Sequence, residues 1–395
     1  MRPEIDRIIA SGRETVGVES GTSAQPVFWA TVLSCLMLWA CFTPLDFAPV
    51  AWVALVPLCQ LLRLKRLPRY SYRIITSVGF VWAVATLQWM RLGHWTMYGA
   101  LIALAFYVSL YLPAFVGIGR QVVRAGVPVW LAVPIVWTAL EYLRAWLLTG
   151  FSWYYLGHSQ YQWTALVQIC DLTGAYGVTF LVALASGALS VCVPAAWLLR
   201  TGLAESSTAV RGLSMRQQVL AVSLAAGLVL VSCLYGVRQQ TIPTSDTAGP
   251  VVAVIQGNFT PELKHDADQW LRMVNEHDLL SRRAAGLRPD LIVWPETMFP
   301  VPDQVISEGV TDEDLVSLLP LQGAATNSEV VRNEIARWHS GRARELLVNR
   351  SQETGAAMLV GLLTEVAHKY GRDRFNSAAF FRPDLGYVGR YDKMH

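Results

Sequence analysis

Seven apolar segments occupy most of the first 240 residues and leave little choice of architecture for that part of the chain. A bilayer core about 30 Å thick requires roughly 20 apolar residues per crossing helix. The segments are Pro26–Phe42, Phe47–Leu62, Ile74–Leu92, Met97–Gly119, Val127–Leu148, Gly174–Leu199 and Gln218–Gly236. They predict a multi-pass α-helical membrane domain of about seven spans.

Charged residues are scarce in this apolar region and common after it. Residues 1–245 hold 16 Lys and Arg and 8 Asp and Glu, whereas residues 246–395 hold 16 and 21. This pattern predicts a polar N-terminus over 1–25, a membrane domain over 26–240, a linker over 241–250 and a water-soluble domain over 251–395. The formal net charge of +3 is too small to indicate a nucleic-acid partner.

Basic residues predict the orientation of the spans. The basic residues that flank the spans gather in alternate connections between spans. The remaining connections contain few basic residues besides Arg91. By the positive-inside rule, the N-terminus is cytoplasmic and the soluble domain lies outside the membrane. The basic residues are Arg63, Lys65, Arg66, Arg69, Arg73, Arg120, Arg124, Arg200, Arg211 and Arg216.

Two ionisable residues lie inside the fifth predicted span, within the segment Trp137–Gln160. Glu141 and Arg144 are three positions apart and can share one face of a helix. Ionisable groups inside a span are costly and usually turn toward protein or a water-filled cavity. The pair is therefore interpreted either as a structural ion pair or as a contribution to substrate binding at a lipid entrance.

The soluble part alternates short β-branched runs with helical patterns, which predicts an α/β domain. Expected strands cover 251–256, 290–295, 356–366, 377–382 and 387–391, and an expected helix covers 267–286. Proline is expected to stop the second strand at Pro295. The acidic stretch 303–344 is poorly periodic apart from one helix beginning near Asn327, and it is interpreted as a disordered insertion or an arm over the site.

Glu296 and Lys393 each follow an expected strand. Open α/β sheets bind ligands beyond the carboxyl ends of their strands. A carboxylate and an ammonium at one rim could act as a general base and as a stabiliser of an oxyanion. Either residue alone is the kind of charge that commonly ends a strand at the surface.

Four pieces of the soluble part, together with EYLRAWLLTGFSWYYLGHSQ and DLTGAYGVTFLV in the apolar part, resemble the membrane-bound apolipoprotein N-acyltransferases of the nitrilase (carbon–nitrogen hydrolase) superfamily. The pieces are VIQGN (254–258), LIVWPET (291–297), FNSAAFF (375–381) and RYDKMH (390–395). The resemblance implies an αββα sandwich with a Glu-Lys-Cys triad, in which Glu296 is the general base and Lys393 stabilises the oxyanion. It implies no metal or cofactor.

The chain departs from this family at two places. The nucleophilic cysteine should follow the lysine by some tens of residues, but all six cysteines lie between Cys35 and Cys233. We therefore expect a fragment truncated before its nucleophile, an incomplete sandwich, and no turnover by the fragment itself. The segment after VIQGN often carries a tryptophan in the family, whereas here Lys264 and His265 stand at the corresponding place and are the predicted substrate contacts.

The resemblance implies transfer of an acyl chain from a phospholipid, through a cysteine thioester, to the N-terminal S-diacylglyceryl-cysteine of an apolipoprotein. The expected location is the inner membrane, with the nitrilase-like domain on the periplasmic side. Two alternatives stay open: a membrane-tethered amidase of the nitrilase type, and a non-catalytic truncated membrane protein.

Overall fold

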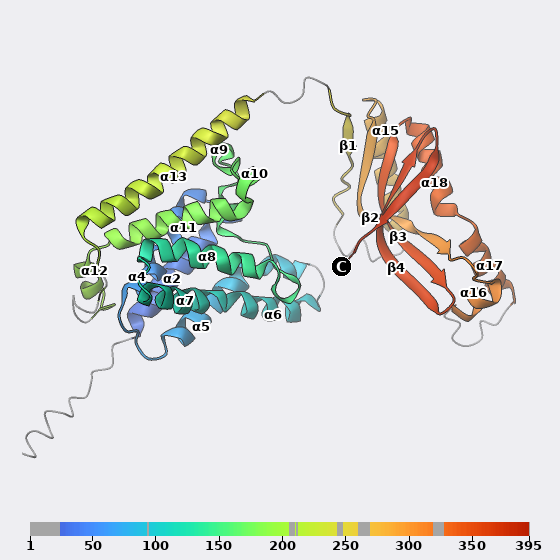
Figure 1. Ribbon diagram of the computed structural model, residues 1–395. Helices are drawn as coiled ribbons and strands as arrows, with labels where there is room; N and C mark the ends of the chain where they lie inside the picture. The colour runs from blue at the N-terminus through green and yellow to red at the C-terminus, as the bar shows by residue number, and fades with distance from the viewer. Residues whose placement is uncertain are drawn as a thin grey trace, which may run out of the picture. The chain divides into compact units, whose positions relative to one another are not determined.

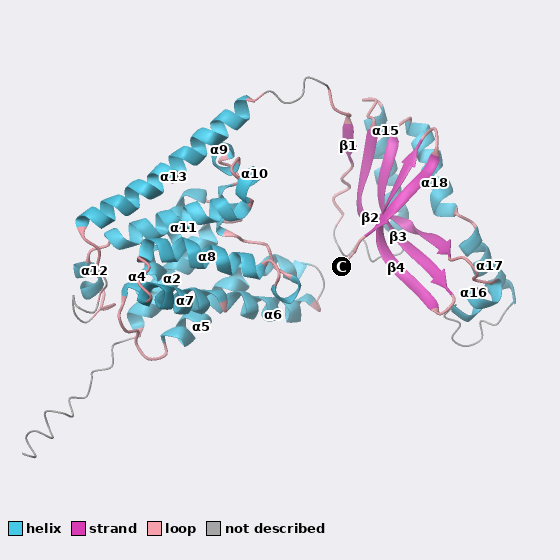
Figure 2. Ribbon diagram, in the orientation of Figure 1, coloured by secondary structure: helices cyan, strands magenta, loops and turns pink. Residues whose placement is uncertain are grey.

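The computed structural model describes residues 24–92, 95–204, 210, 212–242, 248–259, 269–318 and 328–394. The chain divides after residue 244 into two compact units (Figure 1). The first unit is helical, and the second combines helices with one β-sheet (Figure 2).

The described helices of the first unit follow the predicted apolar segments closely, with several short helices between them. Each segment falls on one helix or on a chain of adjoining helices. In order, these are α2 (Gln25–Ala40), η1 (Ala48–Val50), α3 (Ala51–Ala54), α4 (Val56–Arg63), α5 (Ser71–Thr86), η2 (Gln88–Leu92), α6 (Met97–Ser109), α7 (Tyr111–Arg124), α8 (Val129–Arg144), η3 (Leu147–Thr149), η4 (Leu156–Gln160), α9 (Thr164–Val167), α10 (Cys170–Thr173), α11 (Ala175–Cys192), α12 (Ala195–Arg200) and α13 (Met215–Thr241).

Within the described part of the chain, three helical stretches are long and apolar enough to cross a membrane: Met97–Arg124, Ala175–Cys192 and Met215–Thr241. The other four predicted spans coincide with shorter helices: the first is the single 16-residue helix α2, and the chain turns or breaks within the remaining spans. For example, the second predicted span is divided among η1, α3 and α4, and Pro57 stands in the first turn of α4. The structure thus supports a membrane protein, and the number of seven spans stays a prediction.

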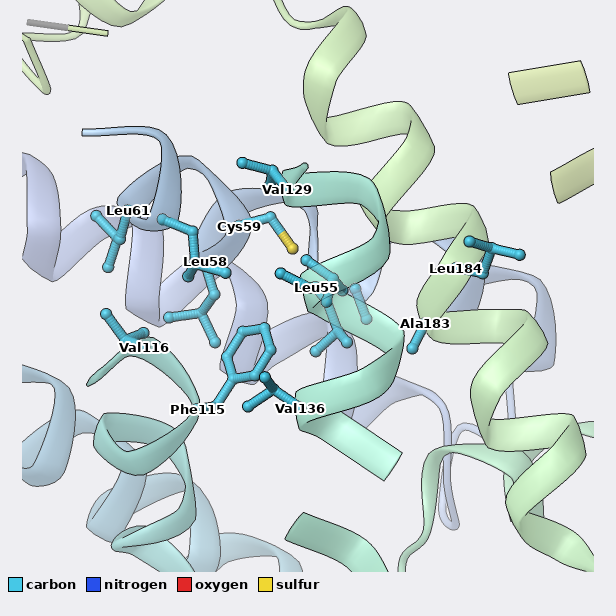
Figure 3. Close-up of a cluster of buried hydrophobic side chains, with 14 of the residues drawn as sticks. Leu55, Leu58, Cys59, Leu61, Phe115, Val116, Val129, Val136, Ala183 and Leu184 are labelled. Carbon is cyan, nitrogen blue, oxygen red and sulfur yellow. The ribbon is translucent and has the colours of Figure 1, made fainter. Parts of the chain in front are cut away.

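A buried apolar cluster joins the helices of the first unit. Leu55, Leu58 and Cys59 share this cluster with Phe115 of α7 and with residues of α8 and α11 (Figure 3). Gly187 of α11 permits the close approach of α8, since a Cβ atom on it would lie 2.9 Å from the carbonyl oxygen of Trp130. Small residues commonly allow such crossings between membrane helices.

Two of the basic residues used to predict the orientation are buried in the first unit. Arg63 donates hydrogen bonds to the carbonyls of Ser190 and Val193, at the end of α11, at 2.7 and 2.8 Å. Arg120 donates to three carbonyls at the end of α4, at 2.5 to 3.1 Å. Both guanidinium groups therefore bind helix C-termini, where unpaired carbonyls and the helix dipole favour a cation.

The second unit contains a five-stranded mixed sheet in the order β1-β2-β3-β4-β5. Strands β1, β2 and β3 are parallel, and β4 and β5 continue the sheet in antiparallel fashion. The elements are β1 (Val252–Val254), α15 (Trp270–Ala285), β2 (Leu291–Ile306), α16 (Asp312–Leu318), α17 (Ser328–His339), α18 (Arg342–Thr354), β3 (Ala357–His368), β4 (Gly371–Arg382) and β5 (Gly386–Asp392).

Helices α15 and α18 pack against one face of the central strands. Met358, Val360 and Ala379 point toward these helices and form a buried core with residues of both. Because side chains alternate along a strand, Leu359 and Ala378 belong to the opposite face. The structure thus gives one sheet with helices on one side, and the complete αββα sandwich stays an expectation.

Two predictions for this unit were wrong. Strand β2 does not stop at Pro295 but continues to Ile306 through two irregularities in its pairing with β3. The described parts of 303–344 contain the end of β2, the helices α16 and α17, and the start of α18, so they do not fit a disordered insertion, whereas the alternative of an arm over the site stays a prediction. The helix expected near Asn327 is α17.

Candidate active site

A bulge in β2 places Glu296. Regular pairing with β3 runs to Trp294, which faces Val360, and resumes only at Phe299, which faces Leu362. The intervening residues of β2 outnumber those of β3, so they leave the plane of the ladder, as in β-bulges near active sites. Pro295 is tolerated there because a bulged residue needs no N–H for pairing.

Gly361 of β3 makes room for this bulge. A Cβ atom at position 361 would lie 2.4 Å from the carbonyl oxygen of Pro295 and 2.7 Å from Cα of Glu296. These distances are far below van der Waals contact, and the atoms concerned are backbone atoms. The absence of a side chain on Gly361 therefore determines where the Glu296 backbone can lie.

Lys393 reaches the same place from the end of β5. Its backbone N–H donates to the carbonyl of Asn376 at 2.9 Å. Its Nζ lies 3.2 Å from Oε1 of Glu296, and both side chains are more than half exposed, at 58% and 63%. The structure thus brings together the two residues that the sequence analysis selected.

Asn376 of β4 is a site residue that the sequence analysis missed. Its Nδ2 donates a hydrogen bond to Oε1 of Glu296, the same oxygen that Lys393 approaches. Its Oδ1 accepts a hydrogen bond from Thr297 Oγ1 at 3.2 Å. The signal available in the sequence was an amide side chain in FNSAAFF, a mostly apolar strand.

These residues line a pocket of about 240 Å³. The neighbouring walls come from β3, β4 and β5 and include Leu359 and Ala378, which belong to the sheet face opposite α15 and α18. The remaining lining residues are Trp294, Leu359, Gly361, Ser377, Ala378 and Tyr391. The arrangement offers a carboxylate that can accept a proton and an ammonium that can stabilise a developing negative charge.

The chain's cysteines do not belong to this pocket, because all six lie between positions 35 and 233, in the first unit. Among the residues that the structure describes, no group of three or more His, Cys, Asp or Glu side chains could hold a metal ion. Lys264 and His265, the predicted substrate contacts, lie outside the described residues.

Glu141 and Arg144 are buried in the first unit, but no ion pair within 4 Å joins them among the described contacts. Glu141 accepts hydrogen bonds from Trp137 Nε1 and Leu156 N, both at 2.8 Å, and from Thr179 Oγ1 at 2.7 Å. The carboxylate thereby joins α8 to η4 and α11. The direct hydrogen-bond partners of Glu141 are thus Trp137, Leu156 and Thr179, and the structural ion pair with Arg144 stays a prediction.

Arg144 instead holds the segment that follows its own helix. Its Nη2 donates to the carbonyls of Trp153 and Tyr154 at 3.1 and 3.3 Å. Its guanidinium also lies over the rings of Tyr111 and Tyr155. A contact of Arg144 with substrate stays a prediction.

Comparison with known proteins connects both units to one family. Residues 34–188 match the model of the apolipoprotein N-acyltransferase N-terminal domain, and residues 251–395 match that of carbon-nitrogen hydrolases. The pocket described above lies wholly within the second match.

Several curated proteins share this similarity. The chain is 32% identical over 282 residues to the apolipoprotein N-acyltransferase of Geobacter metallireducens, covering 68% of this chain and 50% of the relative. It is 31% identical over 309 residues to that of Chromobacterium violaceum, covering 74% and 54%. The chain spans about half the length of these relatives. Together, the two family models and these relatives show that the chain belongs to the apolipoprotein N-acyltransferase family.

Proposed function

We propose that this protein transfers an acyl chain from a membrane phospholipid to the α-amino group of an apolipoprotein's N-terminal S-diacylglyceryl-cysteine. The observation that carries the proposal is the 3.2 Å contact between Lys393 Nζ and Glu296 Oε1. A carboxylate and an ammonium in one pocket are the groups that an acyl transfer through a thioester needs beside a thiol.

In the first step, Glu296 takes the proton of a cysteine thiol, and the sulfur attacks the carbonyl carbon of a phospholipid acyl ester. A C–S bond forms and the negative charge develops on the carbonyl oxygen, where Lys393 stabilises it. The C–O bond to glycerol then breaks, and Glu296 returns the proton to the leaving hydroxyl.

In the second step, the amine of the apolipoprotein attacks the thioester. An amide C–N bond forms, the C–S bond breaks, and the amine's proton returns to the sulfur by way of Glu296. We propose that the thiol belongs to a cysteine on the C-terminal side of Lys393, by the family pattern. Reading the gene past codon 395 tests this assignment directly.

The membrane part fits substrates that both carry acyl chains. We propose about seven spans in the inner membrane, with the N-terminus in the cytoplasm and the hydrolase domain in the periplasm. The support is the concentration of basic residues in alternate connections. A reporter protein that is active only in the periplasm, fused after residue 250, should be active. Activity only of a cytoplasmic reporter at that position would refute this orientation.

Acyl-enzyme trapping tests the proposed reaction. The product of the complete reading frame, purified in detergent, should take label from a phospholipid labelled in its acyl chain and lose it to hydroxylamine, which cleaves thioesters. Glu296→Gln and Lys393→Met should each reduce labelling at least about 100-fold, the usual scale for general acid–base groups. Transfer of the label to a synthetic lipopeptide with a free α-amino group should follow.

Other outcomes would support the alternatives. Hydrolysis of small amides without labelling from phospholipid would favour a membrane-tethered amidase that uses the same two residues. A reading frame with no cysteine after Lys393, together with no labelling, would favour a membrane protein without catalysis.

A further inference from the structure

A buried carboxylate connects β2 with the strand that carries Lys393. Asp303 has a side chain only 2% exposed, and its two oxygens accept hydrogen bonds from Nε and Nη2 of Arg344 at 2.8 and 3.0 Å. Arg390 of β5 approaches the same carboxylate, with Nη1 at 3.8 Å from Oδ2. A buried carboxylate is stable only with such partners, so Asp303 restrains both arginines.

Arg390 also binds Asp392, the last residue of β5. Its Nε lies 3.0 and 3.1 Å from the two carboxylate oxygens of Asp392. Asp392 also accepts a hydrogen bond from Ser377 Oγ at 2.6 Å, and Ser377 is its partner in the ladder between β4 and β5. Asp392 is thus fixed both along its own strand and to the neighbouring strand.

The four charged side chains described above have no net charge together. Asp303 and Asp392 carry negative charges, and Arg344 and Arg390 carry positive ones. Burial acts to lower the pKa of Arg344, but the hydrogen bonds and charge of Asp303 outweigh it and raise the pKa. The guanidinium of Arg344 therefore keeps its charge beside Asp303 at neutral pH.

Lys393 directly follows Asp392, at a strand end that would otherwise be free to separate from the sheet. The ends of strands are among the parts of a fold that open most easily. The only backbone bond that the structure gives to Lys393 among the described residues is the one to Asn376.

We propose that Arg390 and Asp392 are positioning residues, which hold the end of β5 so that the ammonium of Lys393 meets the carboxylate of Glu296. The roles of Lys393 and Glu296 in catalysis rest on the proposed function. The placement of the two groups does not, and it can be measured without turnover.

Zero-length cross-linking with a carbodiimide measures this placement, because it joins a carboxylate and an amine only when they are in contact. In the product of the complete reading frame, purified in detergent, peptides containing Glu296 and Lys393 should be recovered as one cross-linked species by mass spectrometry. Arg390→Gln should reduce the yield at least about 5-fold, and Ser377→Ala, which removes a single hydrogen bond, about 2-fold.

Arg382→Gln is the matched control. It removes an exposed Arg–Asp pair, with Asp384 at 2.6 Å, from the turn of the same β4–β5 hairpin. The cross-link should keep its wild-type yield in this variant. If Arg390→Gln does not fold, as judged by circular dichroism, Ser377→Ala and Asp392→Asn decide the question. Wild-type yield in the folded variants overturns the proposal.

Two further outcomes separate this inference from the proposed function. Failure of the wild-type protein to cross-link would contradict the contact that supports the function itself. In the product of the complete reading frame, Arg390→Gln should lower kcat at least about 10-fold and leave the KM for phospholipid unchanged. A changed KM with unchanged kcat would contradict a positioning role.

Discussion

Gly361 and Pro295 lie so close together that a Cβ atom on the glycine would be 2.4 Å from the proline's carbonyl oxygen. The contact joins two neighbouring strands at the bulge that carries Glu296. Residue 361 therefore determines where the backbone of Glu296 can lie, although glycine has no side chain that could react.

Gly361→Ala should therefore displace the bulge without abolishing the fold. Overpacking of this kind costs about 1–3 kcal/mol, and the displaced backbone moves Glu296 away from Lys393. We expect the carbodiimide cross-link between these residues to fall at least about 5-fold. Gly389→Ala in β5 is the control, because open space surrounds the Cβ position there. Equal cross-linking in the two variants would contradict this role of Gly361.

Glu141 should be essential for the stability of the first unit. Glu141→Ala leaves three donors without their acceptor, at about 1–3 kcal/mol for each unsatisfied group. Glu141→Gln keeps one acceptor oxygen and should lose less stability. Equilibrium unfolding in mixed detergent micelles measures both changes, and a stable Glu141→Ala variant would show that η4 and α11 do not depend on this carboxylate.

Arg120→Lys should destabilise the first unit although it conserves the charge. A lysine cannot reproduce the guanidinium geometry that reaches three carbonyls at the end of α4, so we expect a loss of about 1–3 kcal/mol. Arg124 is exposed at the C-terminal end of α7, the helix that also carries Arg120. Arg124→Lys should therefore change stability by less than about 0.5 kcal/mol. Similar melting temperatures for the two variants would contradict a capping role for Arg120.

The 395-residue chain should aggregate when it is produced alone. The edge strands of its sheet expose apolar residues, including Val254 at 73% and Tyr391 at 64%, and exposed edges recruit further strands. Size-exclusion chromatography in detergent should show large species, and Val254→Lys should reduce them. A monodisperse wild-type sample that melts cooperatively would refute this prediction.

The sequence predicted the parts of the site that depend on local pattern. Glu296 and Lys393 were identified because each follows an expected strand, and the structure places them in contact. The length of β2 was not predictable in this way, because a proline inside a strand pattern usually indicates its end. Only the pairing with β3, and the space at Gly361, allow β2 to continue.

Other features depend on contacts between distant segments and left no local signal. Arg63 and Arg120 were interpreted as loop charges, yet each binds carbonyls of a helix far away in sequence. The spacing of Glu141 and Arg144 permits an ion pair, but it gave no sign that Thr179 and Leu156, from later segments, donate hydrogen bonds to the carboxylate. Spacing on one helix shows which residues can meet, and tertiary packing decides which do.

Asn376 binds Lys393 through its backbone oxygen and Glu296 through its side chain. Both charged groups are thus attached to one residue of an inner strand. Thermal displacement of that strand carries the two groups in the same direction, so their separation should fluctuate less than their individual coordinates do. In a domain built in this way, the strands around the pocket can move while the proton acceptor and the cation keep their mutual geometry.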